Sequence, residues 1–246
     1  PSYEALLQDR KLLVPITKIV EREQSPFNGR PMVQRHGDRA VVIESPAFPL
    51  KSAELDALYD LPFTRRPHPM YRQTIPAFTM IKDSITVVRG CPAGCTFCGI
   101  GVHQGKFLTS RSENSVLKEI RLMTQQPDFR GTISDLGGPT ANLYGCENDV
   151  EEACKVCRRP SCFHPTICNK FHIETAPAIE LMRAARESEK VKHVHVQSGI
   201  RMDVAFRQPD YLKELIHHHV SGHLKVAPEH LHPDVLKRMR KPAGPL

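Results

Sequence analysis

Three cysteines lie close together in VVRGCPAGCTFCGIGVHQGKF, the stretch from residue 87 to residue 107. Cys91, Cys95 and Cys98 follow a β-branched apolar run with the spacing C-x3-C-x2-C. A closed structural zinc site uses four ligands, commonly in two close pairs. An iron–sulfur cubane held by only three thiolates leaves one iron open, which is what a catalytic metal centre needs. The spacing therefore favours a [4Fe–4S] cluster with one open position.

Glycines surround these cysteines at positions 90, 94, 99 and 101. They allow a tight loop to wrap a bulky cluster and to point backbone amides at its sulfurs, which helps to set the reduction potential. Thiolates are soft ligands and suit iron–sulfur clusters. A zinc site, or a set of merely buried thiols, is the alternative interpretation of the same residues.

The composition is that of a globular chain without a membrane segment. Of the 246 residues 40% are hydrophobic and 25% charged, no apolar run approaches the roughly 18 residues of a membrane span, and no signal peptide opens the chain. We therefore expect a cytoplasmic protein, in which eight cysteines hold metal or do chemistry and do not form structural disulfides. The net charge of +7 would suit an anionic partner, but Lys and Arg are scattered, so nucleic-acid binding has weak support.

A second group of cysteines surrounds the segment CKVCRRPSCFHPTIC, residues 154–168. The stretch has few apolar residues to fold around, so a metal held by four ligands would stabilise it. We predict a second metal site made of Cys146, Cys157, Cys162 and Cys168. Cys154 is left out because it sits close to Cys157, and His164 could replace one sulfur. Zinc and an auxiliary iron–sulfur cluster both fit the spacing, and reduced thiols on a surface loop are the alternative.

From Ile85 onward, short β-branched runs alternate with amphipathic helices, as parallel βαβ units do. The predicted strands span residues 84–90, 131–136, 192–199 and 223–230. The helices after them are predicted to begin near Glu113, Pro177, Pro209 and Pro233. Ser110 or Ser112 can cap the first helix, whose buried stripe is Val116, Leu117, Ile120 and Met123. This repetition gives an open doubly wound α/β sheet or part of a barrel.

Groups that could form a site follow each predicted strand. The cysteine loop follows the first strand, Gly137-Gly138-Pro139 the second, the segment from Ser198 to Arg201 the third, and Glu229 the fourth. In parallel α/β folds, ligands bind beyond the carboxyl ends of the strands. All of these groups are therefore predicted to lie on one rim.

Residues 1–84 differ in pattern from the rest and are predicted to be a lead-in segment. They are rich in proline, with a turn at Asn28-Gly29, a short strand near Ala40 to Ile43 and a helix near Ser52 to Tyr59. Residues 85–246 are predicted to form the core, with a cysteine-rich insertion at about 139–170.

The pattern C-x3-C-x-aromatic-C, with Phe97 as the aromatic residue, resembles the signature of the radical S-adenosylmethionine (SAM) superfamily. Further segments resemble the YgiQ-type subgroup of that superfamily, and together they cover the chain from about Gln34 to Pro242. They are HGDRAVVIESPAFPL, LPFTRRPHP, IPAF, TSRSENS, ISDLGGPTAN, SGIRMD and LKVAPEH.

The resemblance implies a [4Fe–4S] cluster on Cys91, Cys95 and Cys98, with SAM chelating the open iron through its amino and carboxylate groups. Phe97 would lie beside the adenine, and the backbone of Gly137-Gly138 would bind the methionine amino group. Members of the superfamily often end that second motif with glutamate. This chain has Pro139 there, so only backbone recognition carries over.

Rim position suggests the remaining cofactor contacts. Glu229 is predicted to bind the ribose hydroxyls, and Ser198 and Arg201 to reach the methionine carboxylate. The resemblance implies reductive cleavage of SAM to a 5′-deoxyadenosyl radical, which abstracts hydrogen from a substrate that the sequence does not identify. An external electron donor such as flavodoxin or ferredoxin is implied.

The resemblance also implies a TIM-barrel-like fold, of which about four of the roughly six strands are visible, so further strands are expected past Leu246. Two other functions stay open. One is a methylthiotransferase-like RNA modifier that sacrifices an auxiliary cluster. The other is a non-catalytic module in which both cysteine groups hold zinc and the basic surface binds nucleic acid.

Overall fold

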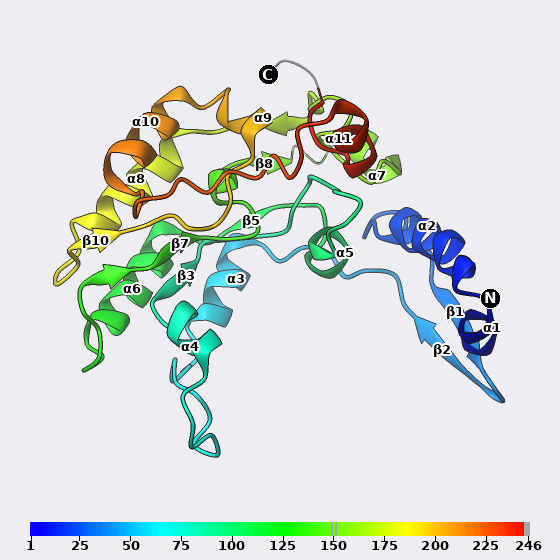
Figure 1. Cartoon of the computed structure of the whole chain (residues 1–246), viewed down its shortest axis with the longest axis horizontal. Helices are drawn as coiled ribbons and strands as arrows, with labels where there is room; N and C mark the ends of the chain where they lie inside the picture. The colour runs from blue at the N-terminus through cyan, green and yellow to red at the C-terminus, as the bar shows by residue number, and fades with distance from the viewer. Residues whose placement is uncertain (149, 151, 244–246) are drawn as a thin grey trace.

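A computed structural model describes residues 1–148, 150 and 152–243 as a mixed α/β structure (Figure 1). Its α-helices are α1 (Tyr3–Gln8), α2 (Leu13–Glu23), α3 (Ser52–Tyr59), α4 (Pro76–Ile81), α5 (Ile100–Gln104), α6 (Glu113–Thr124), α7 (Glu152–Val156), α8 (Ala176–Arg186), α9 (Met202–Ala205), α10 (Pro209–His218) and α11 (Pro233–Met239). Its strands are β1 (Met32–His36), β2 (Arg39–Ile43), β3 (Ser84–Thr86), β4 (Val88–Arg89), β5 (Thr109–Ser110), β6 (Thr132–Ile133), β7 (Asp135–Gly137), β8 (Glu147–Asn148), β9 (Phe171–His172) and β10 (His193–Val194). Short 3-10 turns are η1 (Arg10–Leu12) and η2 (Ala141–Leu143).

The predicted strands of the core lie side by side and parallel, in chain order. β3 pairs with β7, and β6 pairs with β10. The amide of Leu136 donates to the carbonyl of His195 at 2.8 Å, which continues the pairing of the second strand with the third. The third strand meets the fourth through one parallel bridge between Ile200 and Val226. The pairings are short and scattered, and a closed barrel is not formed by the described residues.

The fourth predicted strand, 223–230, is the clearest departure from the sequence-based prediction. It is extended chain with a single bridge and is not a regular strand. Pro228 has no amide to give to a ladder, and the apolar side chains of Leu224 and Val226 are exposed. Without burial on a face, the β-branched pattern alone does not extend the pairing.

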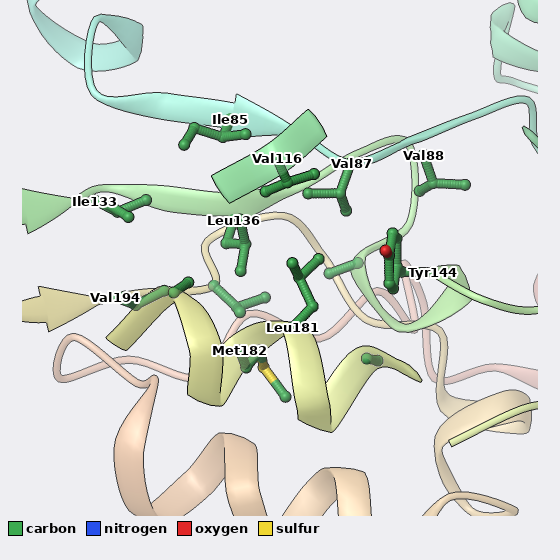
Figure 2. Packing of buried hydrophobic residues seen from close by; sticks show 14 of the residues in the cluster. Ile85, Val87, Val88, Val116, Ile133, Leu136, Tyr144, Leu181, Met182 and Val194 are labelled. Atoms are coloured by element: carbon green, nitrogen blue, oxygen red, sulfur yellow. The ribbon is translucent and has the colours of Figure 1, made fainter. Parts of the chain in front are cut away.

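The helices pack onto these strands and enclose the main apolar core. α6 contacts β3, α8 contacts β10, and α10 contacts α8. Figure 2 shows Val116 of α6 together with Ile85 and Leu136 from the strands, and Leu181 and Met182 of α8 in the same cluster; α6 and α8 also contact each other. Three residues of the predicted α6 stripe, Val116, Ile120 and Met123, are buried, and the fourth, Leu117, is partly buried against the core. The Ser112 side chain caps this helix by accepting from the amide of Ser115 at 3.2 Å.

The lead-in segment is more regular than its sequence predicts. The predicted helix Ser52–Tyr59 is confirmed as α3, and the predicted strand is β2, which forms an antiparallel hairpin with β1. α1 and α2 were not predicted, because neither buries an apolar stripe and α2 carries Pro15 near its start. The hairpin and α1 project from the core at the N-terminal side in Figure 1. Among the described residues, no helix has the length and apolar character needed to cross a bilayer.

A buried carboxylate ties the lead-in segment to the cysteine-rich insertion. Only 2% of the Glu23 side chain is exposed, and its carboxylate pairs with Arg22 at 2.9 Å, Arg30 at 2.8 Å and Arg158 at 3.3 Å. Arg158 also donates to the carbonyl of Asn28 at 2.8 Å. Hydrogen bonds from Arg30, together with the other two arginines, hold the pKa of Glu23 well below its usual value.

We expect Glu23→Gln to lower the thermal unfolding midpoint at neutral pH, because it removes the charge that three guanidinium groups share. Since the folded-state pKa lies below the unfolded value of about 4.5, the contribution of the carboxylate is complete above that pH and is lost as the pH falls. The gap between wild type and variant, measured by calorimetry, should therefore narrow below pH ~4.5. Glu152→Gln is the control, since Glu152 is 87% exposed in its pair with Lys155 and should change the midpoint little. An equal effect of both changes would contradict this account.

Candidate functional site

The loop that carries the three closely spaced cysteines is held in a tight path by glycines with left-handed backbone. It follows β4, which pairs antiparallel with β5. Gly90 has a φ of +86°, and a Cβ there would lie 2.1 Å from the carbonyl oxygen of Phe107. Gly94 has a φ of +59°, and a Cβ there would lie 2.2 Å from the carbonyl oxygen of Pro160. Glycine is required at both positions because any side chain would meet backbone.

The sulfurs of this loop have polar neighbours from the rim. The Sγ of Cys91 is buried and lies 3.9 Å from the Thr140 hydroxyl, and burial raises the pKa of the Cys91 thiol. The Nη1 of Arg201 donates to the Sγ of Cys95 at 3.6 Å. Cys98 is half-buried, and its amide donates to the carbonyl of Cys95 at 3.2 Å. Thr140 and Arg201 follow the second and third predicted strands, so the rim converges on this loop.

The donor set of this loop suits an iron–sulfur cluster. It is purely sulfur and has a hydrogen-bond donor on Cys95, which is how proteins tune iron–sulfur centres. Each thiolate of a cubane binds a different iron. Within the described part of the chain, no three Cys, His, Asp or Glu side chains converge closely enough to hold one metal ion.

Gly137 and Gly138 lie where the second strand meets the first. The amide of Val87 donates to the carbonyl of Gly137 at 2.8 Å. A Cβ on Gly138 would lie 2.8 Å from the Val88 backbone oxygen, and one on Gly137 would lie 2.4 Å from the Ser198 hydroxyl oxygen. The two glycines therefore allow three strand ends to approach one another closely.

The Ser198 side chain is hydrogen-bonded to a carboxylate. Its hydroxyl donates to Asp135, which also accepts from the amides of Gln197 at 2.7 Å and Ser198 at 2.9 Å. Asp135 thus closes the loop after β10 against β7. The predicted contact of Ser198 with a methionine carboxylate would have to compete with this arrangement.

Arg201 lies deeper than its predicted role requires. Its side chain is 4% exposed, pairs with Asp203 at 2.8 Å and stacks over the Phe163 ring at 4.9 Å. Its amide donates to the Oδ1 of buried Asn142 at 2.9 Å. These contacts fix the guanidinium beside Cys95. Arg201 therefore acts on the cysteine loop directly in this structure.

Phe97 and Glu229 are brought together by Lys241. The Phe97 side chain is 52% exposed, and the Nζ of Lys241 lies 5.8 Å from its ring centroid and 3.4 Å from the Oε1 of Glu229. Glu229 has a φ of +68°, a conformation that residues other than glycine rarely adopt. Lys241 and Arg201 both line a cavity of about 260 Å³, whose other walls include Met202, Val226, Ala227, His230, Leu231 and Leu236.

Comparison with known families identifies the family to which the chain belongs. Residues 1–84 match the Radical SAM N-terminal family, and residues 85–245 match the Radical SAM superfamily. The chain belongs to the radical SAM superfamily. The C-x3-C-x2-C loop of this radical SAM chain begins six residues into the superfamily match, directly after the first core strand.

Its similar relatives are UPF0313 proteins of bacteria. The chain is 47% identical to one from Bradyrhizobium diazoefficiens, over 98% of this chain and 36% of the relative. It is 46% identical to one from Shewanella oneidensis, over 98% of this chain and 31% of the relative, and 47% identical to one from Geobacter sulfurreducens, over 98% and 40%. The chain therefore spans about a third of the length of the curated relatives it matches.

The second cysteine group of the radical SAM chain is not arranged as the sequence alone predicts. Cys157, Cys162 and Cys168 line one small cavity, and the fourth cysteine on that cavity is Cys154. Cys146 lies in the core instead, where its Sγ donates to the carbonyl of Glu174 at 3.5 Å and burial raises the pKa of its thiol to about 11. No disulfide joins any of the eight cysteines, all of which are described.

Three residues of the site were missed from sequence. Thr140 follows Gly137-Gly138-Pro139 directly, so its place after a strand could have signalled it. Lys241 and Asp135 have no such signal, because Lys241 lies beyond α11 and Asp135 is inside a strand. Their roles arise only from contacts with Phe97, Glu229 and Ser198.

Proposed function

We propose that this chain forms the cofactor-binding core of a radical SAM enzyme, with a [4Fe–4S] cluster held by Cys91, Cys95 and Cys98. The observation that carries the proposal is the cysteine loop itself, which has three thiols, two obligatory glycines and a buried arginine donating to one sulfur. When bound, the cluster would supply the electron that cleaves SAM to methionine and a 5′-deoxyadenosyl radical, which abstracts hydrogen from the substrate.

The residues around the loop have distinct tasks. Arg201 orients Cys95 and offsets negative charge on the thiolates, and Asp203 holds the guanidinium in place. Burial of Cys91 behind Thr140 excludes water from one side of the loop. The close approach of Gly137 and Gly138 to the first strand leaves backbone, and not side chains, facing the site.

The cavity of about 260 Å³ beside Arg201 is the proposed SAM pocket. Its walls are mainly apolar, with two cations at Arg201 and Lys241, which suits a ligand with an aromatic ring and a carboxylate. The proposed roles are stacking of Phe97 with the adenine, and acceptance by Glu229 from the ribose hydroxyls once Lys241 releases it. Neither side chain lines the cavity itself, and their contacts with Lys241, which does line it, support these roles.

Anaerobic reconstitution with iron and sulfide, followed by reduction in the presence of SAM, tests the proposal. We expect about four irons at this site and formation of 5′-deoxyadenosine. A protein that takes up only zinc and leaves SAM intact would instead support the non-catalytic module.

We expect Arg201→Gln to make the reduction potential of the cluster more negative and to slow SAM cleavage by about tenfold. The reason is that losing a cation beside Cys95 makes the addition of an electron less favourable. Asp203→Asn is the matched variant, because it removes an anion from the same pair and should shift the potential in the opposite direction. Redox titration followed by electron paramagnetic resonance measures both, and shifts of the same sign would contradict the assigned role.

A further inference from the structure

The cysteine-rich insertion gathers four thiols around one small cavity. The cavity has a volume of about 30 Å³ and is lined by Cys154, Cys157, Cys162 and Cys168 together with Lys106, Phe107, Asn148, Arg159, Ser161, Lys170 and Phe171. We propose that it is a structural zinc site whose four ligands are Cys154, Cys157, Cys162 and Cys168. This ligand set replaces Cys146, which the spacing of the sequence favours, with Cys154.

The position of Cys146 argues for this exchange. Cys146 is 3% exposed and does not line the cavity. Its sulfur lies 3.9 Å from the Nε2 of Gln208 and donates to the carbonyl of Glu174, both of which belong to the core side of the insertion. The Nε2 of Gln208 also donates to the carbonyl of Glu174 at 2.7 Å, so Cys146 packs in a buried polar network outside the cavity lining.

Two short turns present the four cysteines in pairs. The amide of Cys157 donates to the carbonyl of Cys154 at 3.2 Å, which closes a C-x2-C turn. The amide of Cys168 donates to the carbonyl of Cys162 at 2.7 Å, which brings the other pair together across five residues. Two close pairs that face one cavity are the usual arrangement of a closed tetrahedral zinc site.

The pairing of the cysteines favours an ion over a cluster, because two close pairs of thiolates are a common ligand set of structural zinc. Since no three metal-ligating side chains of the described residues already converge at ion-binding distance, zinc must draw the sulfurs inward. Short loops joined by turns allow this, and such coupling of metal binding to local folding is common in small zinc sites.

The charge around the cavity matches the site. The Lys106 side chain is 4% exposed, its Nζ donates to the carbonyl of Arg159 at 3.2 Å, and no carboxylate of the described residues pairs with it. A buried ammonium needs a counter-charge. Zinc with four thiolates carries a net charge of −2, which Lys106 and Arg159 would offset. The Nδ2 of Asn148, 3.7 Å from the Sγ of Cys162, adds a donor to one sulfur.

The zinc site would brace the radical SAM loop, a consequence that rests on the proposed function. The amide of Cys162 donates to the carbonyl of Pro92 at 2.8 Å, and the Ser161 hydroxyl donates to the carbonyl of Ala93 at 2.6 Å. A metal ligand at Cys162 thus holds the segment that packs on the loop between Cys91 and Cys95. Because this segment is fixed, the cluster-binding loop has less conformational entropy to lose when it becomes ordered.

Metal analysis of a protein that lacks the first site tests the zinc assignment by itself. In a Cys91→Ala, Cys95→Ala, Cys98→Ala background, we expect about one zinc per chain and no acid-labile sulfide. Adding Cys154→Ser should lower the zinc content at least about tenfold after dialysis against a weak chelator, whereas adding Cys146→Ala should leave it unchanged. Loss of zinc in the Cys146 variant with retention in the Cys154 variant would overturn the ligand set, and iron with sulfide would overturn the metal.

Alkylation of the wild-type protein tests the same four-cysteine ligand set without the triple variant. Cys154, Cys157, Cys162 and Cys168 should become reactive together, and only after a strong chelator has been added, as mass spectrometry of the peptides would show. Labelling of Cys154 before chelation, while the other three stay protected, would overturn the proposal. Because neither readout depends on SAM cleavage, failure of the zinc site and failure of the proposed function are distinguishable.

Discussion

Cys95→Ala is expected to abolish formation of 5′-deoxyadenosine from SAM under reducing conditions. Cys95 is the thiol that Arg201 contacts, and it is one of only three sulfurs available to a cubane on this loop. A cluster held by two thiolates loses iron readily, so the iron content should fall together with the activity. Chromatography of the nucleoside products and iron analysis of the same sample measure both effects.

Cys146→Ala is the control for that experiment, because Cys146 shares an apolar cluster with Cys91 but its Sγ donates to the carbonyl of Glu174 and it lies within neither proposed metal site. It should retain iron and activity even if its stability falls somewhat. A Cys95 variant that still forms 5′-deoxyadenosine at the wild-type rate would contradict the proposed function. A wild-type protein that forms none would contradict it as well.

Gly94→Ala should destabilise the protein by about 2–4 kcal/mol and prevent cluster reconstitution. Its Cβ would lie 2.2 Å from the carbonyl oxygen of Pro160, which is backbone and cannot rotate away. The clash would push the segment containing Pro160 and Ser161 off the cysteine loop and break the hydrogen bond from Ser161 to Ala93. Chemical denaturation gives the stability, and the visible absorbance of the reconstituted protein reports the cluster.

Gly37→Ala distinguishes the effect of the steric clash from the effect of left-handed backbone conformation. Gly37 has a φ of +58°, almost the same as the +59° of Gly94, but a Cβ there meets nothing within 4 Å. Alanine at Gly37 should therefore cost only about 1 kcal/mol and leave the cluster intact. Equal losses in the two variants would show that left-handed backbone, and not packing on Pro160, limits the loop.

Features that depend on neighbours in the chain were predictable. α6 begins where Ser112 can cap it and buries Val116, Ile120 and Met123 as its spacing predicts, because a cap and an apolar stripe act within a few turns. The placement of Cys91, Cys95 and Cys98 on one loop after a strand is local in the same sense. The parallel order of the core strands also follows from the alternation of strand and helix.

Features that depend on burial were harder to predict. The fourth strand has the right residue types, yet Pro228 and the exposed Val226 leave only one bridge. α2 forms with exposed apolar side chains and an internal proline, and its one buried residue, Glu23, is charged. Missing burial in the first case, and the ion pairs of Glu23 in the second, outweigh local propensity.

The sequence by itself determined the spacing of the three thiols, the glycines between them and the order of the strands, because these properties arise from residues a few positions apart. Tertiary structure decided that Arg201 reaches Cys95, that Lys241 joins Phe97 to Glu229, and that Cys154 faces the cavity while Cys146 enters the core. The first two contacts join residues that are distant in the chain, and the third selects one of two cysteines that are close in it. Packing alone makes such choices, since each buried polar group must find its partner in the folded chain.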